Sequence, residues 1–184
     1  MKTIKFLSLA VLTGLFFVSC SSDDNDPEPV VEEETITTMT VSLVPQGGGD
    51  TITLQTRDLD GDGPNAPVIT VSGNLAGNTA YDGTIVLLNE TETPAEDVTE
   101  EVAELDEEHQ FFFQTTGSIG SVTYGDTDGN GNPVGIVFTL NTDTAGAASI
   151  TITLRHEPKK PNNGTLSDAG GETDIAETFD LTIG

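Results

Sequence analysis

Short stretches in which apolar and polar residues alternate constrain the fold of this chain most strongly. Met39, Val41 and Leu43 are each separated by one Thr or Ser, and a period of two predicts a strand with one face in the core. Similar stretches recur, separated by turns rich in Gly, Asn and Asp, and about nine such strands predict a single antiparallel β-sandwich of an all-β domain, immunoglobulin-like in class. Because the chain lacks a Cys…Trp…Cys signature, the strand order stays open. The predicted strands cover residues 38–43, 51–55, 68–71, 84–88, 110–114, 121–124, 134–140 and 149–155, with a last one ending near 183.

Residues 94–105 fit two kinds of structure. Thr93-Pro94-Ala95-Glu96 has the pattern of a helix capping box with proline in the first turn, and Val98, Val102 and Leu105 follow at helical spacing. The acidic segment 99–102 also fits an edge strand whose charges prevent aggregation. Because the flanking segments are strands, we favour the strand.

The N-terminus predicts an export signal and a lipid anchor. Lys2 and Lys5 precede an apolar run over residues 6–18, which is shorter than the ~20 residues of a spanning helix and has the length of a signal-peptide core. The run ends at Val18-Ser19-Cys20, with the only cysteine of the chain. This ending resembles the lipobox of bacterial lipoproteins. The resemblance implies that residues 1–19 are removed and that Cys20 is acylated, typically with palmitate among its chains; the alternative is an ordinary secretory signal.

The residues after Cys20 predict a tether. Residues 20–34 hold Pro27, Pro29 and many acidic side chains, a composition typical of a flexible linker, ahead of a domain over residues 35–184. The cluster Ser21-Ser22-Asp23-Asp24-Asn25-Asp26 resembles the surface-export signal of Bacteroidota lipoproteins. It implies an outer-membrane protein that faces the cell exterior; the alternative is a plain acidic tether. With Cys20 acylated, no disulfide can form, so the core must hold the domain together.

Charge excludes several classes of partner. Loss of Lys2 and Lys5 with the signal leaves four basic residues against 31 acidic ones, a formal charge near −27. Such a charge excludes nucleic acid and direct binding to anionic lipid, and it is compatible with cation binding.

Two acidic loops have the composition of calcium-binding loops. Each places acidic or amide oxygens at alternate positions ahead of a glycine, as the start of an EF-hand loop does. Ile69 and Val137 occupy the position where an EF-hand has glutamate, so any calcium would need ligands from another loop. The alternative is that Asp, Asn and Gly simply form tight turns. The candidate ligands are Asp58, Asp60 and Asp62 in the first loop, and Asp126, Asp128 and Asn130 in the second.

The two histidines predict a second, weaker metal site. His109 and His156 lie at the ends of predicted strands, each beside a carboxylate, Glu108 or Glu157. If both strands end at the same edge of the sandwich, these four side chains could bind a transition metal. The favoured alternative is a pair of rim histidines hydrogen-bonded to acids.

Catalysis has little support in the sequence. Once Cys20 is acylated no cysteine nucleophile remains, and Gly117-Ser118-Ile119-Gly120 lacks the Gly-x-Ser-x-Gly spacing of a nucleophile elbow. We therefore expect a protein that is not an enzyme.

Thr51 and Thr144 lie in Asp-Thr-apolar triplets that resemble O-glycosylation sites of extracytoplasmic Bacteroidota proteins.

Five further stretches carry a resemblance to known proteins: residues 57–67, 108–110, 128–135, 154–158 and 170–174. Together they resemble a group of flavobacterial lipoproteins of unestablished function that are labelled "type 1 periplasmic binding fold superfamily protein". That label implies a two-lobed α/β fold, for which this chain lacks the βαβ pattern. The genes of the group commonly lie near TonB-dependent outer-membrane receptors. The resemblance therefore implies a surface-anchored accessory module that works with such a receptor in ligand or metal capture. The alternative is a structural or adhesive module with calcium-stabilised loops.

Overall fold

The computed structural model describes residues 34–61 and 63–184. Contacts divide the chain into two units, Met1–Glu32 and Glu33–Gly184, and the fold below is that of the second. The predicted signal peptide, Cys20, the tether before Glu34 and the candidate ligand Asp62 lie outside the described residues, so the predictions on them stay predictions. Within the described part of the chain, no helix is long and apolar enough to cross a membrane.

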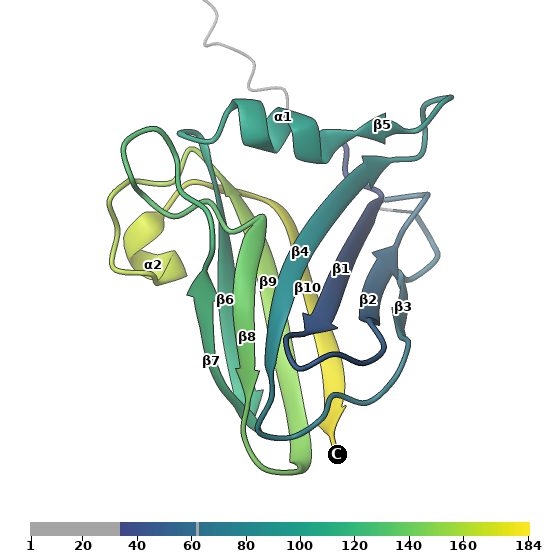
Figure 1. The fold of residues 1–184 in the computed structure, drawn as a ribbon. Helices are drawn as coiled ribbons and strands as arrows, with labels where there is room; N and C mark the ends of the chain where they lie inside the picture. The colour runs from purple at the N-terminus through teal and green to yellow at the C-terminus, as the bar shows by residue number, and fades with distance from the viewer. Residues whose placement is uncertain (1–33, 62) are drawn as a thin grey trace, which may run out of the picture. The chain divides into compact units, whose positions relative to one another are not determined.

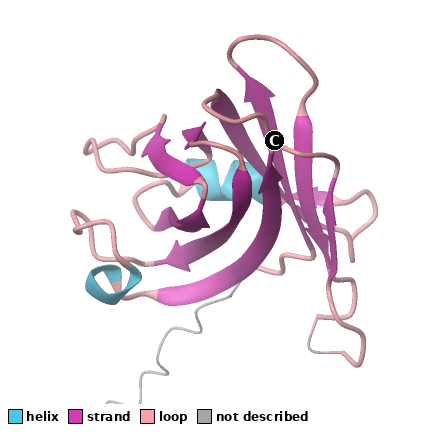
Figure 2. Ribbon diagram, turned by 90° about the horizontal axis from the view of Figure 1, so that it is seen from below, coloured by secondary structure: helices cyan, strands magenta, loops and turns pink. Residues whose placement is uncertain are grey.

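The described residues are built mainly of strands (Figures 1 and 2). They form two sheets in which every strand pair is antiparallel. The elements in chain order are β1 (Thr38–Pro45), β2 (Ile52–Arg57), β3 (Val68–Val71), β4 (Ala80–Asn89), β5 (Glu96–Asp97), α1 (Val98–Glu104), β6 (His109–Gly117), β7 (Ile119–Tyr124), β8 (Val137–Thr142), β9 (Gly146–His156), α2 (Leu166–Ala169) and β10 (Glu172–Ile183).

The predicted all-β sandwich is confirmed. One sheet has seven strands in the order β3-β2-β1-β4-β8-β7, with β5 paired to β4, and the other has three in the order β10-β9-β6. This strand order, which the sequence left open, divides the strands seven and three, whereas a constant-type immunoglobulin domain divides them four and three.

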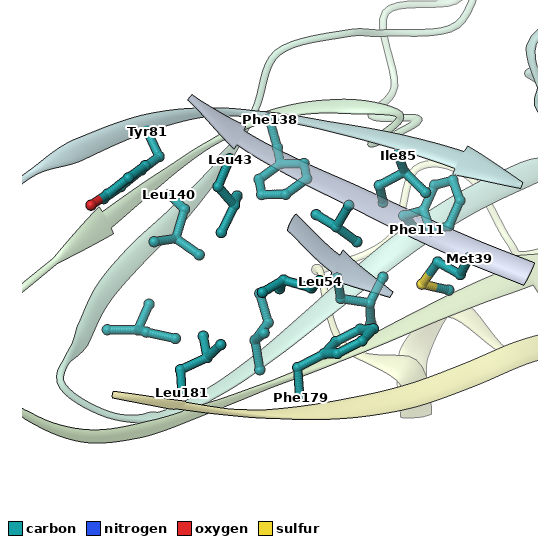
Figure 3. Packing of buried hydrophobic residues seen from close by; sticks show 14 of the residues in the cluster. Met39, Leu43, Leu54, Tyr81, Ile85, Phe111, Phe138, Leu140, Phe179 and Leu181 are labelled. Carbon is teal, nitrogen blue, oxygen red and sulfur yellow. The ribbon is translucent and has the colours of Figure 1, made fainter. Parts of the chain in front are cut away.

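The core lies between the two sheets and follows from the alternation in the sequence. Met39, Val41 and Leu43 are fully buried, as their period of two predicts, and they face the three-stranded sheet. Figure 3 shows Leu43, Tyr81, Phe138 and Leu140 on one side of this core and Phe179 and Leu181 on the other. Because each fully buried large apolar side chain contributes ~1.5–3 kcal/mol, such a core can hold the domain without a disulfide.

The segment after β4 corrects the preference for an edge strand. Residues 98–104 form helix α1, and only Glu96 and Asp97 pair with β4 as a strand. The helix begins after Asp97, whose carboxylate accepts a 3.0 Å hydrogen bond from Thr99 N, rather than after Thr93. Val98 and Val102 are 2% and 0% exposed, since helical spacing turns both toward the open end of the sandwich. Figure 1 shows α1 lying across that end.

The few basic side chains of the domain all have partners inside it. The exposed pairs Arg57–Glu90 and Lys159–Asp168 are 2.6 and 3.2 Å long, and the buried pair Lys160–Asp128 is 3.4 Å long. Arg155 donates to Gly171 O at 3.1 Å. No other lysine or arginine occurs after residue 19.

Candidate metal centre

The fold brings the two histidines into contact. β6 begins at His109 and β9 ends at His156, and the strand register places the two residues directly opposite each other. Each histidine is two residues from a buried apolar side chain of its own strand, Phe111 on β6 and Leu154 on β9, and so points to the same inner face. His156 Nδ1 lies 3.1 Å from His109 Nε2. Both histidines therefore lie at the end of the sandwich that α1 covers (Figure 1).

Two carboxylates complete the cluster. Glu34 precedes β1, and its Oε1 lies 2.9 Å from His109 Nε2 and 3.6 Å from His156 Nδ1. Asp174 belongs to β10, and one ligand atom from each of the four side chains lies within 4.8 Å of the others. Among the described residues this is the one group of three or more His, Cys, Asp or Glu with such a spacing.

A β-bulge brings Asp174 to the histidines. In the β9–β10 pair Thr173 lies opposite Arg155 and Ile175 opposite Leu154, so Asp174 is an extra residue in β10. If the pairing continued without the bulge, Asp174 would lie opposite Leu154, which is fully buried in the apolar core. Bulges re-aim side chains in this way and are frequent beside functional sites. The bulge therefore allows β10, whose later residues pack in the apolar core, to carry a carboxylate ligand near its start.

The acids predicted from the sequence are not part of the cluster. Glu108 and Glu157 are both exposed, because the neighbour of an inward-facing strand residue points to the other face. Their places are taken by Glu34 and Asp174, which sequence reasoning missed. Glu34 is the last of three consecutive glutamates whose composition predicts part of the tether, and it lies 75 positions before His109. No local pattern marks either residue as a ligand.

Hydrogen bonding fixes the tautomer of His109. Its Nδ1 lies 3.1 Å from the carbonyl oxygen of Leu105, and because a carbonyl can only accept, Nδ1 carries the proton. Nε2 of the neutral ring then directs a lone pair at Glu34 Oε1. If His156 Nδ1 carries its proton, it can donate to only one of its two neighbours, and His109 Nε2 and Glu34 Oε1 still face each other as acceptors 2.9 Å apart. A cation between these atoms would contact all of them.

Three of the four ligand atoms are spaced as in the ligand shell of a small tetrahedral ion. Bonds of about 2.0–2.1 Å to Zn²⁺ place tetrahedral ligand atoms about 3.4 Å apart. The triangle formed by His109 Nε2, His156 Nδ1 and Glu34 Oε1 has sides of 2.9, 3.1 and 3.6 Å. The bond from His109 Nδ1 to a backbone carbonyl is also the outer contact that metal-bound histidines usually make. The residues present thus fit a zinc-class ion.

The cluster is shielded from solvent. The side chains of His109, Glu34 and His156 are 0%, 5% and 11% exposed, and Glu34 Oε2 is buried without a hydrogen-bond partner among the described residues. Two imidazoles and two carboxylates suit zinc and related transition metals, whereas calcium prefers oxygen alone. Four protein ligands would form a closed site of the kind that binds a metal without catalysis.

The second candidate calcium loop uses its carboxylates to hold the backbone. Asp126 accepts from Gly135 N at 2.6 Å and Val137 N at 3.0 Å. Asp128 accepts from the backbone N–H groups of Asn130 and Asn132. Burial acts to raise the pKa of Asp128, but these hydrogen bonds and the Lys160 ammonium together hold it below its ordinary value. The Asp128–Asn130 contact is that of an Asx-turn, and the Asp126 contacts tie the two ends of the loop together.

The first candidate loop has similar contacts in its described part. Asp58 accepts from Asp60 N at 3.2 Å and Gly61 N at 3.1 Å, and Asp60 accepts from the side chain of Asn65. The hydrogen bond from Asn65 is the largest of the effects that lower the pKa of Asp60. Calcium binding at either loop stays a prediction.

The two candidate glycosylation sites, Thr51 and Thr144, are both exposed, and their modification also stays a prediction.

No family model, curated protein or solved structure matches the chain. Function therefore has to be inferred from the site itself.

Proposed function

We propose that the protein is a surface-anchored, non-enzymatic lipoprotein whose β-sandwich binds a divalent transition metal of the zinc class. The observation that carries the proposal is the convergence of ligand atoms from Glu34, His109, His156 and Asp174 within 4.8 Å of one another. Residues from four separate segments meet there, in a mostly apolar interior where an unpaired charge is costly. A bound cation would compensate the two carboxylates.

The site favours binding over catalysis. A catalytic zinc keeps a position open for water or substrate, whereas a site with four protein ligands is filled. The burial of His109 and Glu34 also leaves little room for a substrate beside the ion. The resulting role is to hold the metal.

The predicted anchor at Cys20 and the resemblance to lipoproteins encoded near TonB-dependent receptors support an accessory role in metal capture at the outer membrane. The alternative is a structural or adhesive surface module in which the ion only stabilises the sandwich. A mild-detergent pull-down from native outer membranes, through a histidine-free tag after Gly184, separates the two. Stoichiometric recovery of a TonB-dependent receptor supports capture, and recovery of the lipoprotein alone supports the alternative.

Metal binding is tested by zinc titration of the mature protein against a chromophoric chelator. We expect one equivalent of Zn²⁺ to bind, and we expect His109→Gln and His156→Gln to lower the affinity at least tenfold. Glu108→Gln and Glu157→Gln are matched controls, because these exposed acids adjoin the histidines and should leave the affinity unchanged. Absence of zinc binding by the unaltered protein, or equal affinity of the histidine variants, would contradict the proposal.

A further inference from the structure

We infer that Glu34 is the exchangeable ligand of the metal centre, so that metal binding and docking of the N-terminal segment 34–36 onto the sandwich are one coupled equilibrium. The inference rests on the proposed metal-binding function and specifies how that site is loaded and emptied.

The four ligands differ in the elements that carry them. His109, His156 and Asp174 lie on β6, β9 and β10, which are neighbours in the three-stranded sheet. Glu34 lies before β1, a strand in the middle of the other sheet. A bound ion would therefore join the two sheets. Glu34 alone belongs to no regular element, so it is the ligand that can move with least cost to the fold.

The hydrogen bonding of the segment changes sharply at Thr37. Thr37 N donates to Leu88 O at 3.0 Å, and Thr37 O accepts from Asp58 N at 2.7 Å. Within the described residues, the backbone of 34–36 makes no such hydrogen bond. Ile36 packs against the core, and Thr35 is exposed. Glu34 is thus held by its two imidazole contacts and by the packing of Ile36.

Withdrawal of Glu34 would open the site. The remaining set of two histidines and one carboxylate leaves one coordination position free, as in zinc sites that exchange ligands. An ion in this buried place could then leave or enter through the position that Glu34 vacates. A closed site for retention and an open site for exchange would differ by the movement of one side chain and the few residues attached to it.

The coupling must act in both directions. If docking of Glu34 tightens metal binding by some factor, the metal must tighten docking of segment 34–36 by the same factor. Glu34 follows Cys20, the predicted acylation site, by 14 residues. The covalent path from the predicted anchor to the sandwich therefore passes through this ligand, and an event that displaces the segment would release the ion.

The test compares Glu34→Gln with Asp180→Asn in the full mature protein. Asp180 is an exposed acid on β10 that pairs with Ser149, so its variant makes the same change of charge far from the cluster. Zinc affinity and the rate of zinc transfer to a chelator are measured for each protein, together with hydrogen exchange of the Thr37 amide, the first hydrogen-bonded amide after the segment. We expect Glu34→Gln to retain zinc with about 5- to 150-fold lower affinity and faster release, and Asp180→Asn to behave like the unaltered protein.

Hydrogen exchange supplies the second readout. We expect zinc to slow exchange of the Thr37 amide in the unaltered protein and in Asp180→Asn, but not in Glu34→Gln. Unchanged zinc affinity in Glu34→Gln, complete loss of zinc binding there, or exchange that does not respond to zinc in the unaltered protein would each overturn the inference and leave the proposed function standing. Failure of the unaltered protein to bind zinc would instead overturn the proposed function.

Discussion

Lys160 carries one of the few positive charges of the domain, and this charge is buried. Its ammonium lies 3.4 Å from Asp128 Oδ2, and the two side chains are 6% and 1% exposed. It also donates a hydrogen bond to Asp106 O, and so ties the loop after β9 to the turn between α1 and β6. The adjacent Lys159 pairs with Asp168 at the surface, where the two side chains are 64% and 32% exposed. Two neighbouring lysines thus make the same kind of contact in opposite surroundings.

These surroundings predict unequal effects of one substitution. Lys160→Met should lower the free energy of unfolding by about 3–5 kcal/mol, because it leaves the buried Asp128 carboxylate without its cation. Lys159→Met should cost less than about 1 kcal/mol, as expected of an exposed ion pair. Denaturant unfolding of both variants measures the difference, and equal losses would show that burial of Lys160–Asp128 does not matter to stability.

The lowered pKa of Asp128 predicts a pH dependence of stability. Its folded pKa lies below the ordinary value, so the folded state holds its proton less tightly than the unfolded state does. The contribution of Asp128 is therefore fully present above the ordinary pKa of an aspartate and is lost as the pH falls through the lower, folded pKa. Asp128→Asn should remove this contribution, so that unfolding free energies measured between pH 5 and pH 2 change less steeply than in the unaltered protein. An identical slope in both proteins would refute the assignment.

At the scale of single elements, helix α1 is the part that sequence pattern alone left undecided. Two valines four positions apart suit a helix, and the acidic residues between them suit an exposed strand equally well. The burial of Val98 and Val102 against the core decides the matter, and that burial depends on the end of the sandwich being open. Local propensity favoured helix and strand about equally for this segment, so only its contacts with the rest of the fold could decide between them.

The N-cap of α1 provides a direct test of this helix. Asp97 accepts from Thr99 N, and its removal leaves a helix N–H group without a partner. Asp97→Ala should lower the free energy of unfolding by about 1 kcal/mol, and Asp97→Asn, which retains a capping oxygen, should lower it less. Thermal or denaturant unfolding measures both variants. Because α1 leads to the Leu105 carbonyl that orients His109, the alanine variant should also bind zinc more weakly.

Strands were predictable wherever one face alternates, and the partners in the metal cluster were not. The pairing of His109 with His156 required only that β6 and β9 be neighbours and end together, which the sequence allowed as a hypothesis. The contribution of Asp174 required a bulge in β10, and that of Glu34 required a side chain just before β1 to contact histidines of the other sheet. Both depend on contacts between residues far apart in the sequence, for which alternation and composition carry no signal.

At the scale of the whole molecule, the proposed ion joins the two sheets of a domain that has no disulfide. A ligand that binds only the folded state stabilises it by about 2.7 kcal/mol at a free concentration one hundred times its dissociation constant. We therefore expect a chelator to lower the melting temperature and Zn²⁺ to restore it, with His109→Gln insensitive to both. If Ca²⁺ restores the melting temperature and Zn²⁺ does not, the stabilising ion lies in the acidic loops and not at the histidines.

The engagement of every arginine and lysine after residue 19 has a consequence beyond stability. With these cations bound to internal partners, the excess of carboxylates has no compensation from the protein and must be balanced by small ions from solution. Such a surface of fixed negative charge attracts cations, divalent ones more strongly than monovalent ones, within a Debye length of ~8 Å at physiological salt. Low ionic strength would thicken this ion layer and high ionic strength would thin it, so the enrichment of cations at the domain would fall as the salt concentration rises.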